Sequence, residues 1–482
     1  MDRIPTYVPN LDTILNGGLP RNSTLFISGV PGSGKTILAS QIIYNNATPD
    51  HKALVVTTVS EPMARIVRFA QGFSFFDAEK VGTSIIYEDI GPLLLQGNGT
   101  RALAHVVDLL MKYQPRLLVI DSFKGIHDVS ESPGGLRRAL YKLAANLATM
   151  PCTTLLVGEY AQGTLAGTPE ATIVDGIIEL SNRSIGLRDY RSLRVRKLRG
   201  SDYVSGEHAF RITSDGITVF PRFVTPPQPR VYTVSQERAQ TGIRGLDEML
   251  GGGLMRGSLT LVAGDPGIGK TVTSLHFLLN GAMQGEPGVY VSFQEDPNQL
   301  KKIAYNFGFE LKKLEDQGLI DISYTSPVEL DVDEQVLRII STVEKVKARR
   351  VVIDSISDFE AGTERDSDRF FNYIYSLGQW FKNHQITVLL TYEMSHMFGS
   401  GLTMTGRGIS HIADNALVMR YVPAGSRILR ALTVLKTRSS AHSTEVREYL
   451  ISEKEGPRIG EPVPGALSIL AGKLSNSLGK TQ

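Results

Sequence analysis

The sequence has little cysteine, little net charge and no long apolar run, and each shortage excludes a class of protein. One residue of 482 is a cysteine, Cys152. A single thiol excludes an internal disulfide framework and a four-cysteine zinc site. We expect Cys152 to be a small buried residue, as free cysteines usually are. The formal net charge is +2, which argues against a dedicated binder of nucleic acid or of membranes.

The apolar residues are spread along the chain. Residues 1–11 contain no long apolar stretch of the kind found in secretory signals. No apolar run reaches the roughly 18 residues of a transmembrane helix. With the single cysteine, this pattern favours a cytoplasmic protein. Hydrophobic residues make up 41% of the chain, which is enough for buried cores, and the length predicts two to four domains.

Two glycine-rich stretches match the phosphate-binding pattern G-x-x-x-x-G-K-[ST]. Residues 29–36 follow a strand-like run at 23–28 and precede a helix-like run at 37–43, and residues 264–271 repeat the pattern. Backbone N–H groups of such a loop attract phosphate, its lysine reaches the β- and γ-phosphates, and its threonine hydroxyl holds Mg²⁺. The residues predicted to bind ATP are Gly29, Gly32, Ser33, Gly34, Lys35, Thr36, Gly264, Gly267, Ile268, Gly269, Lys270 and Thr271.

Several chemical features recur after 233–239 residues. The recurring pairs are Lys35 and Lys270, Asp121 and Asp354, Glu61 and Glu295, and Lys197 and Lys436. A fixed period indicates a duplicated unit. Each copy alternates strand-like with helix-like segments, which predicts a mostly parallel sheet flanked by helices. The fold class is therefore α/β, with tandem P-loop nucleotide-binding domains.

The linker is marked by the prolines at 226, 227 and 229, which cannot continue a helix or a central strand. We expect a first domain at 1–224, a linker at 225–237, a second domain at 238–461 and a flexible tail at 462–482. Each domain is predicted to end in a hairpin. Its arms are apolar, at 177–180 and 193–198 in the first copy and at 416–422 and 428–435 in the second.

Two pairs of carboxylates follow apolar, strand-like runs. Asp121 and Asp354 are predicted to hold Mg²⁺ from the ends of buried strands, the Walker B arrangement. Glu61 and Glu295 lie 26 and 25 residues after the loop lysines. A strand beside the P-loop strand would point such a glutamate at the γ-phosphate, where it could activate water. Alternatively, each begins a helix, because a proline follows and acids suit a first turn.

Two cation pairs lie near the end of each copy. Lys197 and Arg199, and likewise Lys436 and Arg438, are spaced i, i+2, so on a strand each pair shares one face. One interpretation is a solvated strand edge that discourages further pairing. The other is a pair of arginine-finger-like cations that serve the nucleotide of a neighbouring subunit.

Together these motifs resemble the KaiC family of double RecA-type ATPases over nearly the whole chain. The resemblance rests on the two P-loops, the two Walker B aspartates, the repeated Leu-Asp…Gly-Gly-Leu openings and the Lys-x-Arg segments. It implies a homohexamer with ATP between subunits, in which Lys197, Arg199, Lys436 and Arg438 contact the neighbour's nucleotide. It also implies ATP hydrolysis in the first domain, autokinase activity in the second, and a signalling or clock partner for which the tail is a candidate site.

The chain departs from the family pattern at two places. The family carries two adjacent glutamates after the strand expected beside the P-loop strand, and here the first is replaced by Ser60 and Gln294. Neither side chain is a useful base at neutral pH, so hydrolysis is slow or Glu61 and Glu295 take over. At the family's Ser-Thr phosphorylation site, Ser410 is retained but His411 replaces the threonine. Ser410 is the single matching phosphoacceptor.

Two other functions stay open. One is a DNA-stimulated recombination ATPase resembling RecA or RadA, against which the near-zero charge and the lack of a zinc module argue. The other is a nucleotide-gated scaffold with little turnover, which Ser60 and Gln294 motivate.

Overall fold

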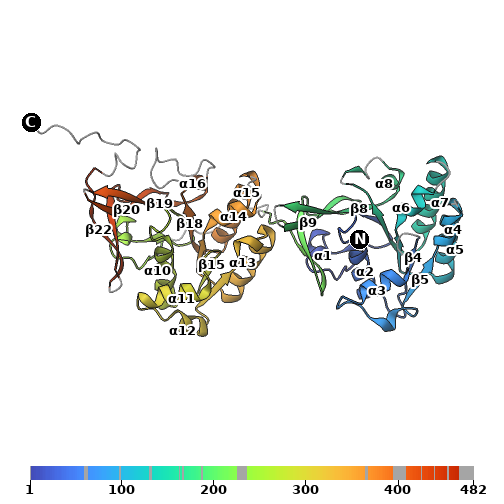
Figure 1. Ribbon diagram of the computed structural model, residues 1–482, viewed down its shortest axis with the longest axis horizontal. Helices are drawn as coiled ribbons and strands as arrows, with labels where there is room; N and C mark the ends of the chain where they lie inside the picture. Colours follow the sequence, from blue (N-terminus) through green and yellow to red (C-terminus); the bar gives the residue numbers. More distant parts are fainter. Residues whose placement is uncertain are drawn as a thin grey trace, which may run out of the picture. The chain divides into compact units, whose positions relative to one another are not determined.

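The computed structural model describes residues 2–58, 63–96, 99–129, 133–161, 163–164, 168–185, 188–224, 236–363, 367–394, 409–424, 426–438, 440–452 and 455–465. The chain divides into two compact units, Met1–Arg222 and Phe223–Gln482. Figure 1 labels helices and strands of each unit. Residues 225–235 of the predicted linker lie outside the described ranges.

The first unit is built on one mixed sheet. In spatial order its described strands are β11 (Gly216–Phe220), β10 (His208–Thr213), β9 (Arg188–Leu198), β8 (Gly176–Ile185), β3 (Thr24–Gly29), β7 (Thr153–Glu159), β6 (Leu117–Asp121), β4 (Ala53–Thr57) and β5 (Ile85–Asp89). The strands from β8 to β5 are parallel, and β9, β10 and β11 continue the sheet antiparallel.

Helices cover both faces of this sheet, so its central strands are apolar at nearly every position. Leu38 and Ile42 of α2 pack on one face, and Val106 of α5 and Leu143 of α7 pack on the other. The helices are α1 (Leu11–Ile14), α2 (Lys35–Asn46), α3 (Met63–Ala70), α4 (Gly91–Leu95), α5 (Gly99–Tyr113), α6 (Phe123–Asp128), α7 (Pro133–Thr149) and α8 (Pro169–Ile173), with a 3₁₀ turn η1 (Ala78–Lys80).

The second unit repeats this architecture. In spatial order its described strands are β16 (Ile320–Tyr324), β15 (Gly288–Ser292), β17 (Arg350–Asp354), β18 (Thr387–Glu393), β14 (Leu259–Gly264), β19 (Asn415–Ala424), β20 (Arg427–Thr437), β21 (Val446–Ser452) and β22 (Gly456–Pro462). The strands from β16 to β19 are parallel and the last three are antiparallel.

The helices of the second unit also form two layers. One core cluster contains residues of α10, α11 and α12, and another contains residues of α13, α14 and α15. The helices are α9 (Leu246–Met249), α10 (Lys270–Met283), α11 (Pro297–Asn306), α12 (Leu311–Asp316), α13 (Val332–Val346), α14 (Ile356–Gly362), α15 (Ser367–Asn383) and α16 (Ile409–Ile412), with a 3₁₀ turn η3 (Pro327–Glu329). No helix within the described ranges is long and apolar enough to cross a membrane.

The predicted fold is confirmed: both units are α/β, with a largely parallel sheet flanked by helices and extended by a hairpin. Each hairpin is longer than its apolar arms indicated. In the first, β8 and β9 pair as far as Ile185 and Arg188, and in the second, β19 and β20 pair as far as Ala424 and Arg427. The polar stretch at 181–190 was predicted as a connection. It extends the ribbon instead, because an antiparallel ribbon can keep one face in water.

Short strands open each unit, and a longer strand ends the second unit. Each unit opens with a two-stranded sheet, β1 (Arg3–Ile4) with β2 (Leu19–Pro20), and β12 (Arg238–Ala239) with β13 (Leu254–Met255). At the other end, β22 runs to Pro462 and Val463 still donates its N–H to Val446 O. The described structure thus reaches into the stretch predicted as tail, and residues 466–482 lie outside it.

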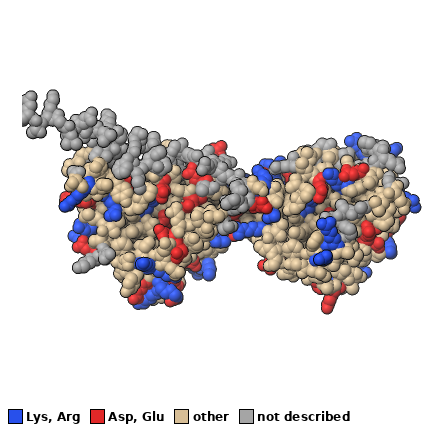
Figure 2. All heavy atoms as spheres, in the orientation of Figure 1, with Lys and Arg blue, Asp and Glu red and all other residues tan. Residues whose placement is uncertain are grey.

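Figure 2 shows acidic and basic side chains interspersed over the visible face, as expected for a net charge of +2.

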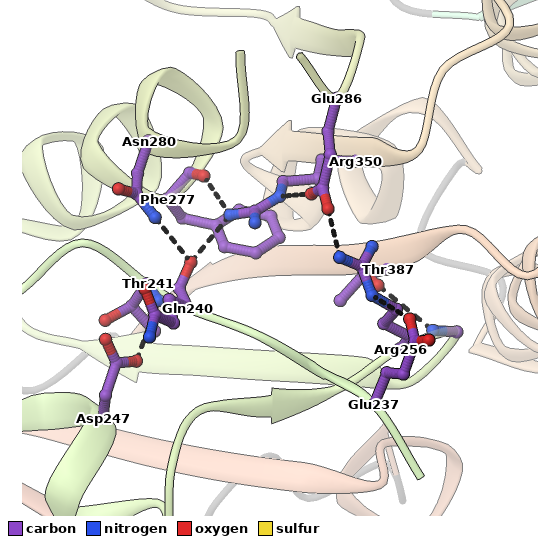
Figure 3. Close-up of polar contacts among 11 residues, drawn as sticks. Glu237, Gln240, Thr241, Asp247, Arg256, Phe277, Asn280, Glu286, Arg350 and Thr387 are labelled. Atoms are coloured by element: carbon purple, nitrogen blue, oxygen red, sulfur yellow. Dashed lines mark hydrogen bonds and ion pairs between the residues drawn. The ribbon is translucent and has the colours of Figure 1, made fainter. Parts of the chain in front are cut away.

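A buried ion pair ties the second P-loop helix to its sheet (Figure 3). Arg350, at the start of β17, is buried, and its Nε donates to Glu286 Oε2 at 2.6 Å. Its Nη1 donates to the carbonyl oxygens of Gln240 at 2.7 Å and Phe277 at 2.8 Å, and the Phe277 ring lies 4.9 Å from the guanidinium carbon. The first unit has Leu117 at this position, so the cluster belongs to the second unit alone.

Candidate active sites at the two phosphate loops

Each phosphate loop joins a buried strand to a helix that begins at the loop lysine. The residue before each helix is a glycine with left-handed backbone, Gly34 at φ 96° and Gly269 at φ 116°. Residues with a Cβ resist this conformation. A Cβ at Gly269 would also lie only 2.8 Å from Ile451 Cδ1. The glycines thus allow the sharp turn that directs the first N–H groups of the helix toward an anion in front of the loop.

Two residues that were predicted as ATP contacts have fully buried side chains. Ser33 and Ile268 are each 0% exposed. Neither side chain is therefore open to a phosphate. The sequence pattern could not separate side-chain from backbone contacts within the loop.

Both loop lysines are held by carbonyl groups of their own loop. Lys35 Nζ donates to Val30 O at 2.9 Å, and Lys270 Nζ donates to Asp265 O at 2.9 Å. Burial lowers the pKa of the Lys270 ammonium, and nearby carboxylates, with Glu393 first among them, partly oppose that shift. Both ammonium groups therefore lie against the backbone of their own loops.

The loop threonine and the strand-end aspartate meet in both units. Thr36 Oγ1 donates to Asp121 Oδ2 at 2.7 Å, and Thr271 Oγ1 donates to Asp354 Oδ2 at 2.9 Å. Both aspartates are buried, and both precede a cis peptide bond. A hydroxyl and a carboxylate side by side form the hard oxygen donor set that suits Mg²⁺ bound together with nucleotide phosphates.

The aspartates of the two units differ in their surroundings. Asp354 also accepts hydrogen bonds from Tyr290 OH at 2.6 Å and from Thr391 Oγ1 at 2.5 Å. The same strand positions in the first unit are Val55 and Val157, which have no hydroxyl to donate. Burial and the charge of Asp354 raise the pKa of the Tyr290 hydroxyl, so it stays a donor. Several of the lone pairs of Asp354 are therefore already occupied.

A cavity of about 350 Å³ lies in front of the first phosphate loop. Its lining includes the expected Lys35, Thr36 and Asp121. It also includes Lys124, from the start of α6, and Glu159, from the end of β7. Sequence reasoning missed both of these residues.

One of the missed residues had a detectable signal. Glu159 ends an apolar strand, as Asp121 does, and Glu393 ends the corresponding strand 234 residues later. This separation of 234 residues lies within the range of 233–239 residues that separates the other repeated features. Lys124 had no such signal, because the matching position in the second unit is Ser357.

The predicted placement of the glutamates after the second strand of each unit is wrong in one respect. Strands β4 and β15 do not lie beside the P-loop strands, because β7 and β6 intervene in one sheet and β18 and β17 in the other. Glu61 lies outside the described residues. Glu295 is partly buried and precedes Asp296, which is the residue that caps α11. The amide of Gln294 donates to Asp358 Oδ2 at 3.4 Å.

The first Lys-x-Arg pair lies at the end of β9. Lys197 Nζ donates to Ala171 O at 3.0 Å. Arg199, one residue beyond the strand, donates to Thr172 O at 3.4 Å and lies 3.8 Å from Asp175. Burial, followed by the charge of Arg199, lowers the pKa of Lys197. The pair is therefore bound to the segment around α8.

The second pair is arranged in the same way. Lys436 Nζ donates to Ala413 O at 2.7 Å, and Arg438 donates to His411 O. Arg438 also lies 3.8 Å from Asp414. Burial, followed by the charge of Arg438, lowers the pKa of Lys436. These partners belong to α16 and the residues after it.

The strand register separates each cation pair from the P-loop of its own unit. Gly29, the first P-loop residue, pairs with Leu180 of β8. Lys197 pairs with Ile177, which lies three residues earlier on β8, and the N–H of Arg199 binds Asp175 O still further back. At about 3.3 Å per residue this places Lys197 about 10 Å back along the strands, toward their opposite ends, and Arg199 further. The structure does not bring Lys197 and Arg199 to Lys35.

Ser410 lies in α16, between Ile409 and His411. Its side chain is outside the described part of the structure. The backbone next to it is held by Arg438 through His411 O. The predicted phosphoacceptor is therefore close in sequence to residues that the second cation pair binds.

Comparison with known proteins identifies the family. The family model described as "ATPase: KaiC" matches residues 4–223 and 239–463. The chain belongs to the KaiC ATPase family. It is 29% identical to the circadian clock oscillator protein KaiC of Nostoc sp., over 98% of this chain and 92% of the relative. The KaiC of Synechococcus elongatus is 29% identical over 98% and 91%, and that of Thermosynechococcus vestitus is 30% identical over 94% and 88%.

Proposed function

We propose that this chain binds ATP with Mg²⁺ at both phosphate loops and hydrolyses it. One observation carries the proposal: in each unit the loop threonine donates to a buried strand-end aspartate. Chance glycine-rich loops have no reason to meet a carboxylate in this way. The hydroxyl and carboxylate oxygens fit Mg²⁺, with the nucleotide phosphates and water completing its coordination. Bound there, Mg²⁺ would supply charge neutralisation, and Lys35 and Lys270 would bind the β- and γ-phosphates.

We also propose that the nucleotide sites are completed by a neighbouring subunit in a homohexameric ring. By the strand register, Lys197 lies about 10 Å back along the strands from its own loop, and Arg199 lies further back. At that distance they serve a loop presented by another copy more readily than their own. Lys436 and Arg438 repeat the arrangement in the second unit. Such cations stabilise the charge that develops during phosphoryl transfer.

In this proposal the second unit is an autokinase whose acceptor is Ser410. The support is local, because Arg438 binds the carbonyl of His411 next to this serine. If Lys436 and Arg438 contact the γ-phosphate held by the neighbouring subunit, Ser410 lies close to that phosphate. With His411 in place of a second hydroxyl residue, one phosphorylation site per chain is expected.

The protein then acts as a cytoplasmic signalling or timing protein. The relatives are named as circadian clock oscillator proteins, which supports a partner of that kind. The segment 462–482 is the proposed partner site, and most of it lies outside the described residues.

The test is incubation with γ-labelled ATP and Mg²⁺, with free phosphate and protein-bound label followed together. We expect released phosphate, and label that disappears in Ser410→Ala. A Lys35→Ala/Lys270→Ala protein that binds ATP normally would contradict the proposal. If phosphate is released without protein label, the ATPase assignment stands and the kinase assignment is wrong.

A nucleotide-gated scaffold is the second candidate. It is favoured by the exposed Gln294, whose amide donates to Asp358 and offers no base. In that case ATP binds and stabilises the ring with little turnover. Ser60→Glu/Gln294→Glu should then create hydrolysis that the unmodified protein lacks.

A further inference from the structure

The strand beside each P-loop strand ends in a glutamate. Gly29 at the end of β3 is paired in register with Glu159 of β7, and Gly264 at the end of β14 is paired with Glu393 of β18. Neighbouring strands lie about 4.8 Å apart, and parallel strands present their carboxyl ends at one edge. Each glutamate therefore starts next to the first glycine of its loop.

The surroundings of Glu159 indicate that it faces the reacting phosphate. It lines the cavity that also contains Lys35, Thr36 and Asp121. It is exposed to that space although the rest of β7 is buried. The Glu159 carboxylate therefore shares one cavity with the loop lysine that would bind the γ-phosphate.

Glu393 occupies the equivalent position with fixed backbone. Its N–H donates to Ser357 Oγ at 3.0 Å, and the next residue, Met394, donates its N–H to Gly264 O at 3.1 Å. The backbone of Glu393 is thus fixed beside Gly264, the first glycine of the loop.

The residues assigned to this task from the sequence follow a different strand and lack the first glutamate of the family's pair. Strands β4 and β15 are two strands further from the P-loop strand than β7 and β18. Of the family's adjacent glutamates, the first is Ser60 in one unit and Gln294 in the other. Neither of these can take a proton from water at neutral pH.

From this geometry we infer that Glu159 and Glu393 are the catalytic carboxylates that hold and deprotonate the attacking water. The inference rests on the proposed ATP hydrolysis. The water oxygen forms a bond to the γ-phosphorus while the bond from that phosphorus to the β–γ bridging oxygen breaks, and ADP leaves with the bonding electrons. The proton of the water passes to the glutamate and then to the released phosphate or to solvent. The ammonium of Lys35 or Lys270 stays on the γ-phosphate oxygens throughout.

The test isolates the first site in a Lys270→Ala background, where the second loop is disabled. Glu159→Gln keeps the size of the side chain and removes the base, and Glu159→Asp keeps a carboxylate. We expect Glu159→Gln to lower kcat for phosphate release by about 100-fold or more, with the Kd for ATP changed less than about threefold. Glu159→Asp should recover at least about tenfold over the glutamine variant. The matched control, Glu79→Gln in the exposed turn η1, should leave kcat unchanged.

Each other outcome has a defined meaning. Unchanged kcat in Glu159→Gln, with a large loss in Glu61→Gln, would overturn the inference in favour of the glutamate assigned from the sequence. Loss of ATP binding in Glu159→Gln would make Glu159 a structural residue and would also overturn it. A Lys270→Ala parent that binds ATP but releases no phosphate would refute the proposed hydrolysis itself. The same series applies to Glu393 in a Lys35→Ala background.

Discussion

Replacing Glu286 by glutamine tests whether the buried ion pair holds the second P-loop helix to its sheet. The change keeps the shape of the side chain but leaves the buried guanidinium of Arg350 without its counter-ion. Removing one partner of a buried pair costs about 3–5 kcal/mol. The Glu286 side chain retains 13% exposure and also contacts the half-exposed Arg256, so we expect the lower end, about 3 kcal/mol.

The chain provides a specific probe for this measurement. Its single tryptophan, Trp380, lies in α15 of the second unit and is 8% exposed. Urea unfolding followed by tryptophan fluorescence of the full-length protein therefore reports on the second unit. With an m value of about 2–3 kcal/mol/M, the variant should lose about 1 M in its urea midpoint. Glu310→Gln, which removes one partner of an exposed ion pair with Lys313, should change the midpoint by far less.

The effect should also depend on pH in a defined direction. Burial opposes ionisation of Glu286, but hydrogen bonds from Arg350 and Arg256 outweigh it, so its folded pKa lies below the ordinary value of 4.5. The stabilisation is fully present above the ordinary pKa and is lost as pH falls through the folded pKa. The difference between wild type and Glu286→Gln should therefore shrink below about pH 4.5. Equal midpoints for the two proteins at pH 7 would refute the reasoning.

Three further predictions concern the sites and the cysteine. Tyr290→Phe removes one hydroxyl donor from the second unit's strand-end aspartate, so the Mg²⁺ concentration for half-maximal ATP binding in a Lys35→Ala background should fall by about threefold to tenfold. The second prediction tests whether sites form between subunits. It uses two inactive chains, Lys35→Ala and Lys197→Ala, each of which also carries Lys270→Ala. When the two are co-assembled, they should recover about a quarter of the ATPase activity of the Lys270→Ala protein, and no recovery would contradict shared sites. Burial raises the pKa of the Cys152 thiol to about 12, so thiol reagents at pH 7.5 should label it only in urea, and rapid labelling of the native protein would contradict that burial.

Much of the fold was predictable because its signals are local and repeated. The apolar runs before Gly29 and Gly264 had to be buried strands, and a loop with glycine at positions of left-handed backbone had to follow. The hairpins were also expected, but their length was not. Residues 181–185 are polar, and their pairing with β9 is a tertiary contact that alternation alone does not reveal.

The sites were only partly predictable, because strand order is not written in the sequence. The meeting of Thr36 with Asp121 followed from motif chemistry. The position of Glu159 depends on β7 inserting between β3 and β6, and no local pattern states which strand lies next to which. The repeat at Glu393 was the one available clue. The contact between Tyr290 and Asp354 likewise required the register of β15 and β17.

The strand register that separates loop from cation pair also limits how copies can associate. Lys35 and Lys197 lie toward opposite ends of the strands of one sheet, so a contact between the loop of one copy and the pair of another would be head-to-tail and would have a direction. If the sites form between copies as proposed, an open row leaves one loop without its cations, and closure into a ring supplies the last one. Activity per subunit should therefore rise steeply at the concentration at which rings close.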